Sequence, residues 1–303
     1  MAHGWRALEQ SLKPPYDFHL SFKATPPPPP FILERGVLRR CFEVNGDLIP
    51  VKIEPVGDVE EPGVMIYLPP DIDSKAEEIA LSKVVDFLCG DVELNSVYEV
   101  MEDSPILRRM TKVLRGLKPW STPTVWEGLV DSIIFQQVSL RAAFAMMKEL
   151  TERLGERVLM EGELFYGFPQ PLKVASLNLA EIKACKLSWN KARYVKEAAS
   201  KVMEGSFNLE GLKEEPTETA LRRLGALKGV GRWTAELVAL IALRRWEVIP
   251  ADDLGVRRAF AKLFLNSTDT TAEEVRRIAK PWGRWRGLIG YYVLVSYEMG
   301  IRL

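Results

Sequence analysis

The sequence is poor in the side chains that most hydrolases and metal sites use. Its two histidines, His3 and His19, both lie near the N-terminus, which disfavours a Ser-His-Asp triad, a histidine base and a histidine-liganded metal. Its three cysteines, Cys41, Cys89 and Cys185, are odd in number and far apart. This spacing predicts neither a disulfide framework nor a zinc or iron–sulfur site. The chemistry is therefore expected from carboxylates, lysines, backbone amides or aromatic rings.

Long apolar segments are also missing. No apolar run reaches the roughly 18 residues of a membrane-spanning helix. Charges and prolines interrupt the N-terminal segment, so no signal peptide is recognised there. We therefore expect a cytoplasmic protein with no membrane partner.

The chain has no net charge, but its charges are unevenly distributed. Residues 1–100 contain 9 Lys and Arg against 17 Asp and Glu, residues 101–210 contain 16 against 13, and residues 211–303 contain 16 against 11. A polyanion would therefore meet the last two thirds of the chain rather than the first. Ordinary variation of surface charge explains the same numbers, so charge alone decides nothing.

The first hundred residues have the pattern of a small β domain. Short β-branched and aromatic stretches predict strands at Val37–Val44, Leu48–Glu54 and Val64–Tyr67, and Asn45-Gly46-Asp47 predicts a hairpin between the first two. A helix over 75–89 is expected to pack on this sheet. Its sheet-facing residues are expected to be Ile79, Val84, Val85 and Leu88. The proline run Pro26–Pro30 must be extended, and a rigid surface connector is favoured over a docking motif.

Beyond about residue 95 the pattern is helical, with Gly or Pro in the connections. The expected helices are Ser104–Leu117, Thr124–Leu154, Leu179–Lys186, Lys191–Met203, Thr217–Leu224, Arg232–Arg245, Asp253–Leu265, Thr271–Lys280 and Trp285–Met299. The fold class is therefore α+β, with a small N-terminal antiparallel sheet followed by a large all-α region.

A tight turn with two glycines joins two of these helices. The turn reads Leu227-Lys228-Gly229-Val230-Gly231, and Arg232 begins the second helix. Glycine permits a positive φ and close approach of another backbone. The first amides of the second helix lack intrahelical partners and face outward at the positive end of the helix dipole. The turn is therefore a candidate phosphate site, and a phosphate contact carries no sequence information.

A carboxylate follows about twenty residues later. Pro250 stops one helix, and Asp253 could cap the next one, with Asp252 beside it. Capping alone is an ordinary role for an aspartate. The spacing from the glycine turn and the pattern Asp-x-x-Val, completed by Val256, are what make Asp253 a candidate functional residue.

The combination of Leu-x-Gly-Val-Gly-Arg-Trp-Thr-Ala with the later aspartate resembles the helix-hairpin-helix superfamily of DNA glycosylases. Pro14–Phe18, Ile134–Ser139 and Pro281–Arg286 resemble further segments of its 3-methyladenine DNA glycosylase II branch. The resemblance implies a β domain at 1–100 and a glycosylase region at 101–303. Within that region it implies a hairpin-bearing subdomain at about 127–245 and a second helical subdomain from 101–126 plus 246–303.

The resemblance also implies a reaction. Asp253 would be the catalytic carboxylate that stabilises oxocarbenium character on the deoxyribose and orients or deprotonates a water. Bifunctional members carry a lysine that attacks the sugar, at the position of Trp233 in this sequence. Iron–sulfur members have four cysteines near the C-terminus, and none follows Cys185 here. A monofunctional enzyme that excises 3-methyladenine or 7-methylguanine in base-excision repair is therefore expected.

Such an enzyme takes its base out of the DNA stack, fills the gap with a wedge and holds the base against aromatic rings. The expected base-pocket residues are Trp233, Phe135, Tyr291, Tyr292 and Asp252. The expected DNA-binding residues are Gln136 and Trp120, as wedge candidates, with Lys228, Gly229, Gly231, Arg232 and Thr234. Leu237 and Leu294 replace aromatic residues of the resembled enzyme, which leaves hypoxanthine, 1-methyladenine and 3-methylcytosine open as substrates.

No cofactor is required by this chemistry. In the family the hairpin can hold a monovalent cation on backbone carbonyls, which here would be those of Gly225, Leu227 and Val230. The expected partner is double-stranded DNA with a damaged base, bound by a monomer. Two alternatives stay open: a bifunctional glycosylase/lyase for oxidised bases, and a non-catalytic helix-hairpin-helix DNA-binding protein.

Overall fold

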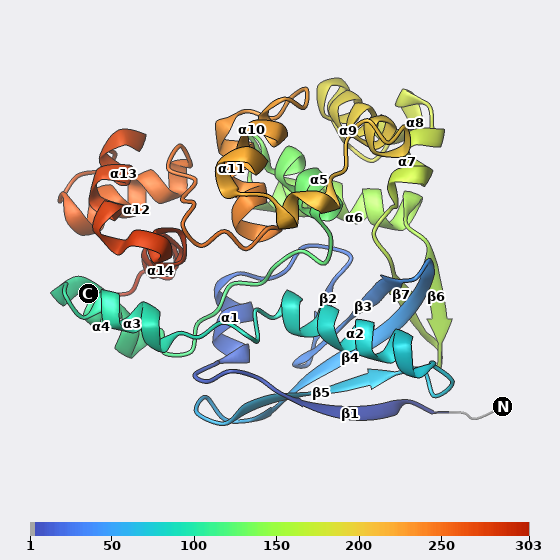
Figure 1. The fold of residues 1–303 in the computed structure, drawn as a ribbon, viewed down its shortest axis with the longest axis horizontal. Helices are drawn as coiled ribbons and strands as arrows, with labels where there is room; N and C mark the ends of the chain where they lie inside the picture. Colours follow the sequence, from blue (N-terminus) through green and yellow to red (C-terminus); the bar gives the residue numbers. More distant parts are fainter. Residues whose placement is uncertain (1–3, 303) are drawn as a thin grey trace.

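The structure, a computed structural model, describes residues 4–302. Its N-terminal part is a five-stranded antiparallel sheet in the order β1-β5-β4-β3-β2 (Figure 1). The strands are β1 (Arg6–Ser11), β2 (Ile32–Glu34), β3 (Val37–Val44), β4 (Asp47–Gly57) and β5 (Pro62–Leu68). The sheet followed by helices confirms the predicted α+β class. The edge strands β1 and β2 were not predicted.

The predicted hairpin joins β3 to β4. Asn45 and Gly46 have φ values of 55° and 94°, the left-handed values that a two-residue hairpin turn needs. The register pairs Val44 with Asp47 and runs to Leu38 opposite Ile53. The Asn-Gly turn and the alternating apolar residues therefore fix this part of the sheet.

Two helices, α1 (Phe18–Ala24) and α2 (Ser74–Phe87), contribute to the core of the sheet, and Figure 1 shows α2 lying across it. The buried face of α2 consists of Ala76, Ala80, Val84 and Phe87. Of the four residues predicted to face the sheet, Val84 and Leu88 are buried, whereas Ile79 and Val85 are only partly buried. The prediction chose large apolar residues, whereas the buried face combines two alanines with Val84 and Phe87.

The proline run does not form a surface connector. Pro27, Pro28 and Pro30 are buried between α1 and β2, so that prediction was wrong. A proline ring is apolar and has no N–H to satisfy, which makes it easy to bury. The next residue, Phe31, stacks on Phe87 with 4.0 Å between ring centroids.

The rest of the chain forms two helical lobes with separate hydrophobic cores. The first core draws on residues 125–248, and we call this part the hairpin lobe. The second core draws on residues 89–117 and 249–295, and we call it the second helical lobe. Figure 1 shows the two lobes side by side above the sheet.

The hairpin lobe contains seven α-helices, one 3-10 helix and a small hairpin in the described residues. These are α5 (Val125–Phe135), α6 (Leu140–Leu154), β6 (Arg157–Met160), β7 (Glu163–Tyr166), α7 (Pro171–Ser176), α8 (Leu179–Lys183), α9 (Trp189–Met203), η1 (Glu210–Glu214), α10 (Thr217–Gly225) and α11 (Arg232–Ile241). The β6–β7 hairpin was not predicted. The single helix predicted over 124–154 is two helices, because Gln137 has a φ of 53° and Ser139 caps α6.

The second helical lobe takes segments from both sides of the hairpin lobe. Its helices are α3 (Asn95–Met101), α4 (Pro105–Val113), α12 (Leu254–Phe264), α13 (Ala272–Ala279), η2 (Lys280–Trp285) and α14 (Arg286–Glu298). None of the helices described in residues 4–302 is long and apolar enough to cross a membrane.

Candidate active site

The turn between α10 and α11 has the geometry that its glycines predict. Gly229 has a φ of 81°, and a Cβ atom at this position would overlap the ring of Tyr194. Both the backbone conformation and the packing therefore require glycine here. Gly231 is the N-cap of α11 and offers no side chain to the helix amides.

Amides and cations face outward at this turn. Within the described residues, the N–H groups of Gly229, Gly231 and Arg232 have no hydrogen-bond partner. Exposed Lys228 pairs with Glu197, and exposed Arg232 pairs with Glu236, each at 3.0 Å. The Lys228–Glu197 pair is exposed at both ends and contributes only about 0–1 kcal/mol, so an incoming phosphate can displace it, whereas Glu236 is buried. The turn thus has the features of an anion site.

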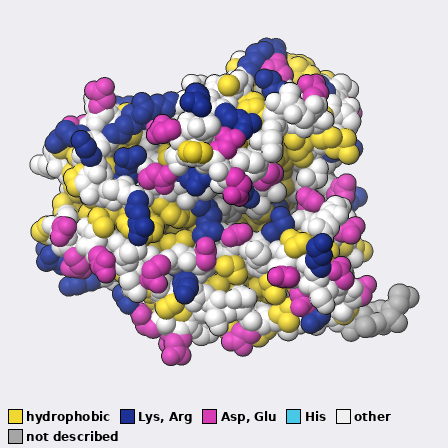
Figure 2. Space-filling view, in the orientation of Figure 1, with side chains coloured by type: hydrophobic (Ala, Val, Ile, Leu, Met, Phe, Trp, Pro, Cys, Tyr) yellow, Lys and Arg dark blue, Asp and Glu magenta, His cyan; other side chains and the backbone are white. Residues whose placement is uncertain are grey.

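Charge on the visible face agrees with a polyanion approaching the helical lobes. Figure 2 shows Lys and Arg side chains gathered over α12 and α13, while Asp and Glu side chains dot the lower edge near the sheet. This distribution matches the acidic first hundred residues and the more basic remainder of the sequence.

Gln136 braces the hairpin. Its Nε2 donates to the carbonyl of Gly229 at 2.8 Å and to Thr234 Oγ1 at 2.9 Å. This amide is engaged inside the protein, so the structure does not present Gln136 as a free wedge. Thr234 is 2% exposed, so its side chain lies inside the protein, and its contact with DNA stays a prediction. The next residue, Gln137, is exposed at the turn between α5 and α6.

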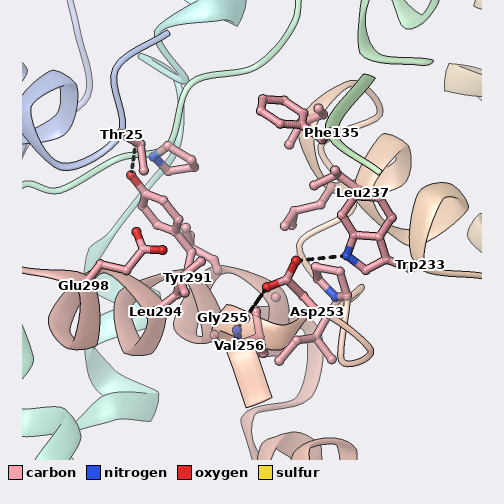
Figure 3. A pocket seen from close by; sticks show the side chains of 18 of the residues that line it. Thr25, Phe135, Trp233, Leu237, Asp253, Gly255, Val256, Tyr291, Leu294 and Glu298 are labelled. Carbon is pink, nitrogen blue, oxygen red and sulfur yellow. Dashed lines mark hydrogen bonds between the residues drawn. The ribbon is translucent and has the colours of Figure 1, made fainter. Parts of the chain in front are cut away.

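Asp253 joins the two helical lobes. As the N-cap of α12, its Oδ1 accepts from the N–H groups of Gly255 and Val256 at 2.8 and 3.1 Å. Its Oδ2 accepts from Trp233 Nε1 at 3.1 Å (Figure 3). Three donors from α11 and α12 therefore fix this carboxylate, which is only partly buried.

The carboxylate faces a cavity of about 430 Å³ between the lobes. A cavity of this size falls in the range of small-molecule sites. Five aromatic residues line it, namely Trp120, Phe135, Trp233, Trp246 and Tyr291. Leu237 and Leu294 complete the apolar wall, and Figure 3 shows both beside these rings.

A second acidic residue, Glu298 at the end of α14, lines the same cavity. Burial and the negative charge of Asp253 raise the pKa of Glu298. Beside it, the Tyr291 hydroxyl lies 2.7 Å from Thr25 Oγ1, and burial raises the pKa of Tyr291 well above its usual value. Glu298 was not predicted from the sequence, because a single glutamate near a helix end has no distinguishing pattern.

Three residues predicted for the base pocket or the wedge lie elsewhere or have other contacts in the structure. Tyr292 is fully buried, its hydroxyl donates to the carbonyl of Leu117 at 2.6 Å, and it does not line the cavity. Asp252 points away and pairs with Arg276 at 2.7 Å. Trp120 lines the cavity and donates from Nε1 to the carbonyl of Thr25 at 2.9 Å, so it is not a protruding wedge.

Side-chain metal ligands are not grouped in the part of the chain that the structure describes. No group of three His, Cys, Asp or Glu residues there could hold an ion. The cysteines are buried and unpaired, and burial raises the pKa of both Cys41 and Cys89 to about 12. The hairpin carbonyls of Gly225 and Val230 accept no hydrogen bond from the described residues, and that of Leu227 accepts one from the Val230 N–H at 3.1 Å.

Comparison with known proteins agrees with this geometry. The model of the HhH-GPD superfamily of base excision DNA repair proteins matches residues 130–284, about half of the chain. The chain belongs to this superfamily. The match includes the glycine turn and Asp253, which confirms the resemblance seen in the sequence.

Individual members of the superfamily are similar over most of the chain. The 3-methyladenine DNA glycosylase from Archaeoglobus fulgidus is 31% identical, with a TM-score of 0.87, over 97% of this chain and 100% of that one. The DNA-3-methyladenine glycosylase of Bacillus subtilis (strain 168) is 26% identical over 219 residues, 72% of each chain. The 8-oxoguanine glycosylase/lyase of Clostridium acetobutylicum has a TM-score of 0.78 over 98% of this chain and 99% of that one. Its sequence is only 17% identical, so the similarity shows a shared fold and nothing further.

Proposed function

We propose that this chain is a monofunctional DNA glycosylase that excises alkylated bases, of the 3-methyladenine and 7-methylguanine type, from double-stranded DNA. The observation that carries the proposal is the fixed carboxylate of Asp253 at an aromatic-lined cavity beside the glycine turn. The superfamily consists of base excision repair proteins, and the two relatives described above at 31% and 26% identity are named as 3-methyladenine glycosylases.

The three hydrogen bonds to Asp253 suit the proposed chemistry. Breaking an N-glycosidic bond develops positive charge on the sugar, and a carboxylate held in place stabilises that charge without reorganising. The same group can orient a water molecule and accept its proton as the water attacks. The N–H of Trp233 would hold the carboxylate toward the cavity while its ring forms part of the wall.

The cavity would receive a base turned out of the duplex. Stacking on the rings of Trp120, Phe135, Trp233 and Tyr291 would favour electron-poor alkylated bases. The gap left in the duplex needs a filler, and we assign this role to Gln137 because it is exposed beside the hairpin whereas Gln136 is engaged.

The residues at the cavity favour hydrolysis over a lyase reaction. A lyase of this superfamily attacks the sugar with an amine, and no lysine lines the cavity within residues 4–302. Trp233 occupies the position of that lysine in the sequence motif. The proposed product is therefore an uncut abasic site.

Two further proposals concern the hairpin and the assembly. The free carbonyls of Gly225 and Val230, with that of Leu227, fit a monovalent cation, which would neutralise their dipoles next to a DNA phosphate. The enzyme is proposed to act as a monomer, because the carboxylate, the cavity and the turn all come from one chain. No metal is needed for the reaction as proposed.

The test is base release from methylated duplex DNA, followed by mass spectrometry. Wild-type protein is expected to release 3-methyladenine or 7-methylguanine. Asp253→Asn is expected to release none while binding the duplex, and Asp252→Asn, the same change one residue earlier, should keep most activity. Full activity in Asp253→Asn would refute the assignment, and no release by the wild type from alkylated, deaminated or oxidised DNA would favour a DNA-binding protein without catalysis.

A further inference from the structure

The cavity is acidic. Of the residues that line it, only Asp253 and Glu298 carry a charge, and both are negative. Tyr291 and Thr25 hydrogen-bond to each other, and Trp120 Nε1 donates to the backbone. The polar groups left to meet a base are therefore mainly these two carboxylates.

Glu298 lacks the partners that Asp253 has. Within the described residues its carboxylate accepts no hydrogen bond and forms no ion pair. Glu298 is an exposed residue at the edge of the cavity, and two features beside it disfavour a negative charge: the nearby Asp253 and the last turn of α14, where the helix dipole is negative. A carboxylate that lines the cavity and has no partner in the described residues is available to a ligand that carries positive charge.

The position of Glu298 separates it from the reacting bond. It belongs to α14, whereas Asp253 begins α12 and Trp233 belongs to α11. Figure 3 shows Glu298 and Trp233 on opposite sides of Asp253, with Tyr291 next to Glu298. A base stacked on these rings would place its sugar toward Asp253 and could turn an edge toward Glu298.

We propose that Glu298 is a specificity-determining residue that selects bases carrying positive charge and an exocyclic amino group. This inference rests on the proposed glycosylase function. Nucleotides of 3-methyladenine, 7-methylguanine and 3-methylcytosine are cationic, and their amino groups can donate to a carboxylate. Hypoxanthine is neutral and has no exocyclic amino group, so it offers the carboxylate neither the positive charge nor the N–H donor.

The experiment compares two duplexes, one with 7-methylguanine and one with hypoxanthine, under single-turnover conditions. The variant Glu298→Gln keeps the shape of the side chain and removes its charge. Glu78→Gln, an exposed glutamate of α2 in the β domain, is the control for the same change of net charge. The melting temperature of each variant checks that it is folded.

Glu298→Gln is expected to lower the rate ratio of 7-methylguanine to hypoxanthine release roughly 10- to 100-fold, as loss of a hydrogen bond to a charged group predicts. Glu78→Gln should leave the ratio unchanged. If the wild type releases only 7-methylguanine, a tenfold fall in that rate with unchanged DNA affinity is the expected result.

The inference is overturned if Glu298→Gln leaves the ratio of 7-methylguanine to hypoxanthine release unchanged, including the case in which both release rates fall by the same factor. If the wild type releases only 7-methylguanine, an unchanged rate of that release overturns it. These outcomes leave the proposed function standing, because the wild type still releases a base. If the wild type releases neither base and no other alkylated base, the proposed function fails, and this inference fails with it.

Discussion

The ion pair that attaches the sheet to the hairpin lobe gives a quantitative test of the fold. Arg40 on β3 donates to both carboxylate oxygens of Glu127 on α5, at 2.8 and 3.0 Å. The two side chains are 4% and 2% exposed. The Arg40 guanidinium also lies over the rings of Phe31 and Phe42, at 4.4 and 5.0 Å from their centroids.

Replacing Arg40 by Met removes the one cation of this buried group. It leaves two buried carboxyl groups, those of Glu127 and Asp131, and both oxygens of Asp131 lack a hydrogen-bond partner in the described structure. Breaking a buried pair by removing one partner costs about 3–5 kcal/mol of unfolding free energy. The lost contact with the two rings adds about 0.5–2 kcal/mol.

The cost should depend on pH in a definite direction. In the variant, buried carboxyls bind protons more tightly than in the unfolded chain, so stability falls as the pH rises above the usual carboxyl range. The deficit relative to wild type, measured by urea unfolding, is therefore expected to be largest at neutral pH and smaller at about pH 4 to 5. The double variant Arg40→Met with Glu127→Leu should recover most of the loss.

Two results would refute this reasoning. One is a deficit for Arg40→Met below about 1 kcal/mol, which is the value of an exposed pair. The other is a double variant no more stable than the single one, since that would mean that the uncompensated Glu127 is not the source of the cost.

Three further predictions follow from single contacts. Trp233→Phe keeps a ring but removes the hydrogen bond from the indole N–H to Asp253. Base release in single-turnover assays should slow about 10- to 100-fold, with little change in DNA affinity. An unchanged rate would show that this hydrogen bond does not contribute to catalysis. Gly229→Ala should weaken duplex binding and lower the melting temperature more than Gly162→Ala does. Both glycines have a positive φ, but only Gly229 packs against a ring, that of Tyr194. Equal effects in the two variants would contradict this. Burial and the neighbouring carboxylate of Glu127 raise the pKa of Asp131, so Asp131→Asn should stabilise the fold at neutral pH, by about 1.4 kcal/mol for each unit of that shift. This gain should disappear toward pH 4, where the aspartate is protonated. A difference in urea-unfolding free energy that does not vary with pH would argue against this.

The sequence predicted those features that local chemistry determines. The Asn45-Gly46 turn defined the β3–β4 hairpin, and the glycine turn followed by Arg232 defined the start of α11. The capping position of Asp253 followed from Pro250 and the next apolar residues. In each case a turn or cap is built from a few adjacent residues, and their side chains report it directly.

Features that depend on packing between distant segments were not predictable in this way. Tyr291 and Tyr292 are neighbours about 100° apart on α14, so only one of them can face the cavity, and the sequence gives no reason to choose. Gln136 appeared free because its partners come from the hairpin nearly a hundred residues later. The domain boundaries at 100, 127 and 245 stay a prediction.

The central claim is that Asp253 cleaves N-glycosidic bonds without cutting the strand. The most direct measurement treats one methylated duplex with wild-type protein and counts released bases, abasic sites and strand breaks together. The account predicts equal numbers of released bases and abasic sites, no breaks above background and no covalent adduct after borohydride reduction. Strand breaks or a trapped adduct matching the released bases would contradict it and identify a lyase.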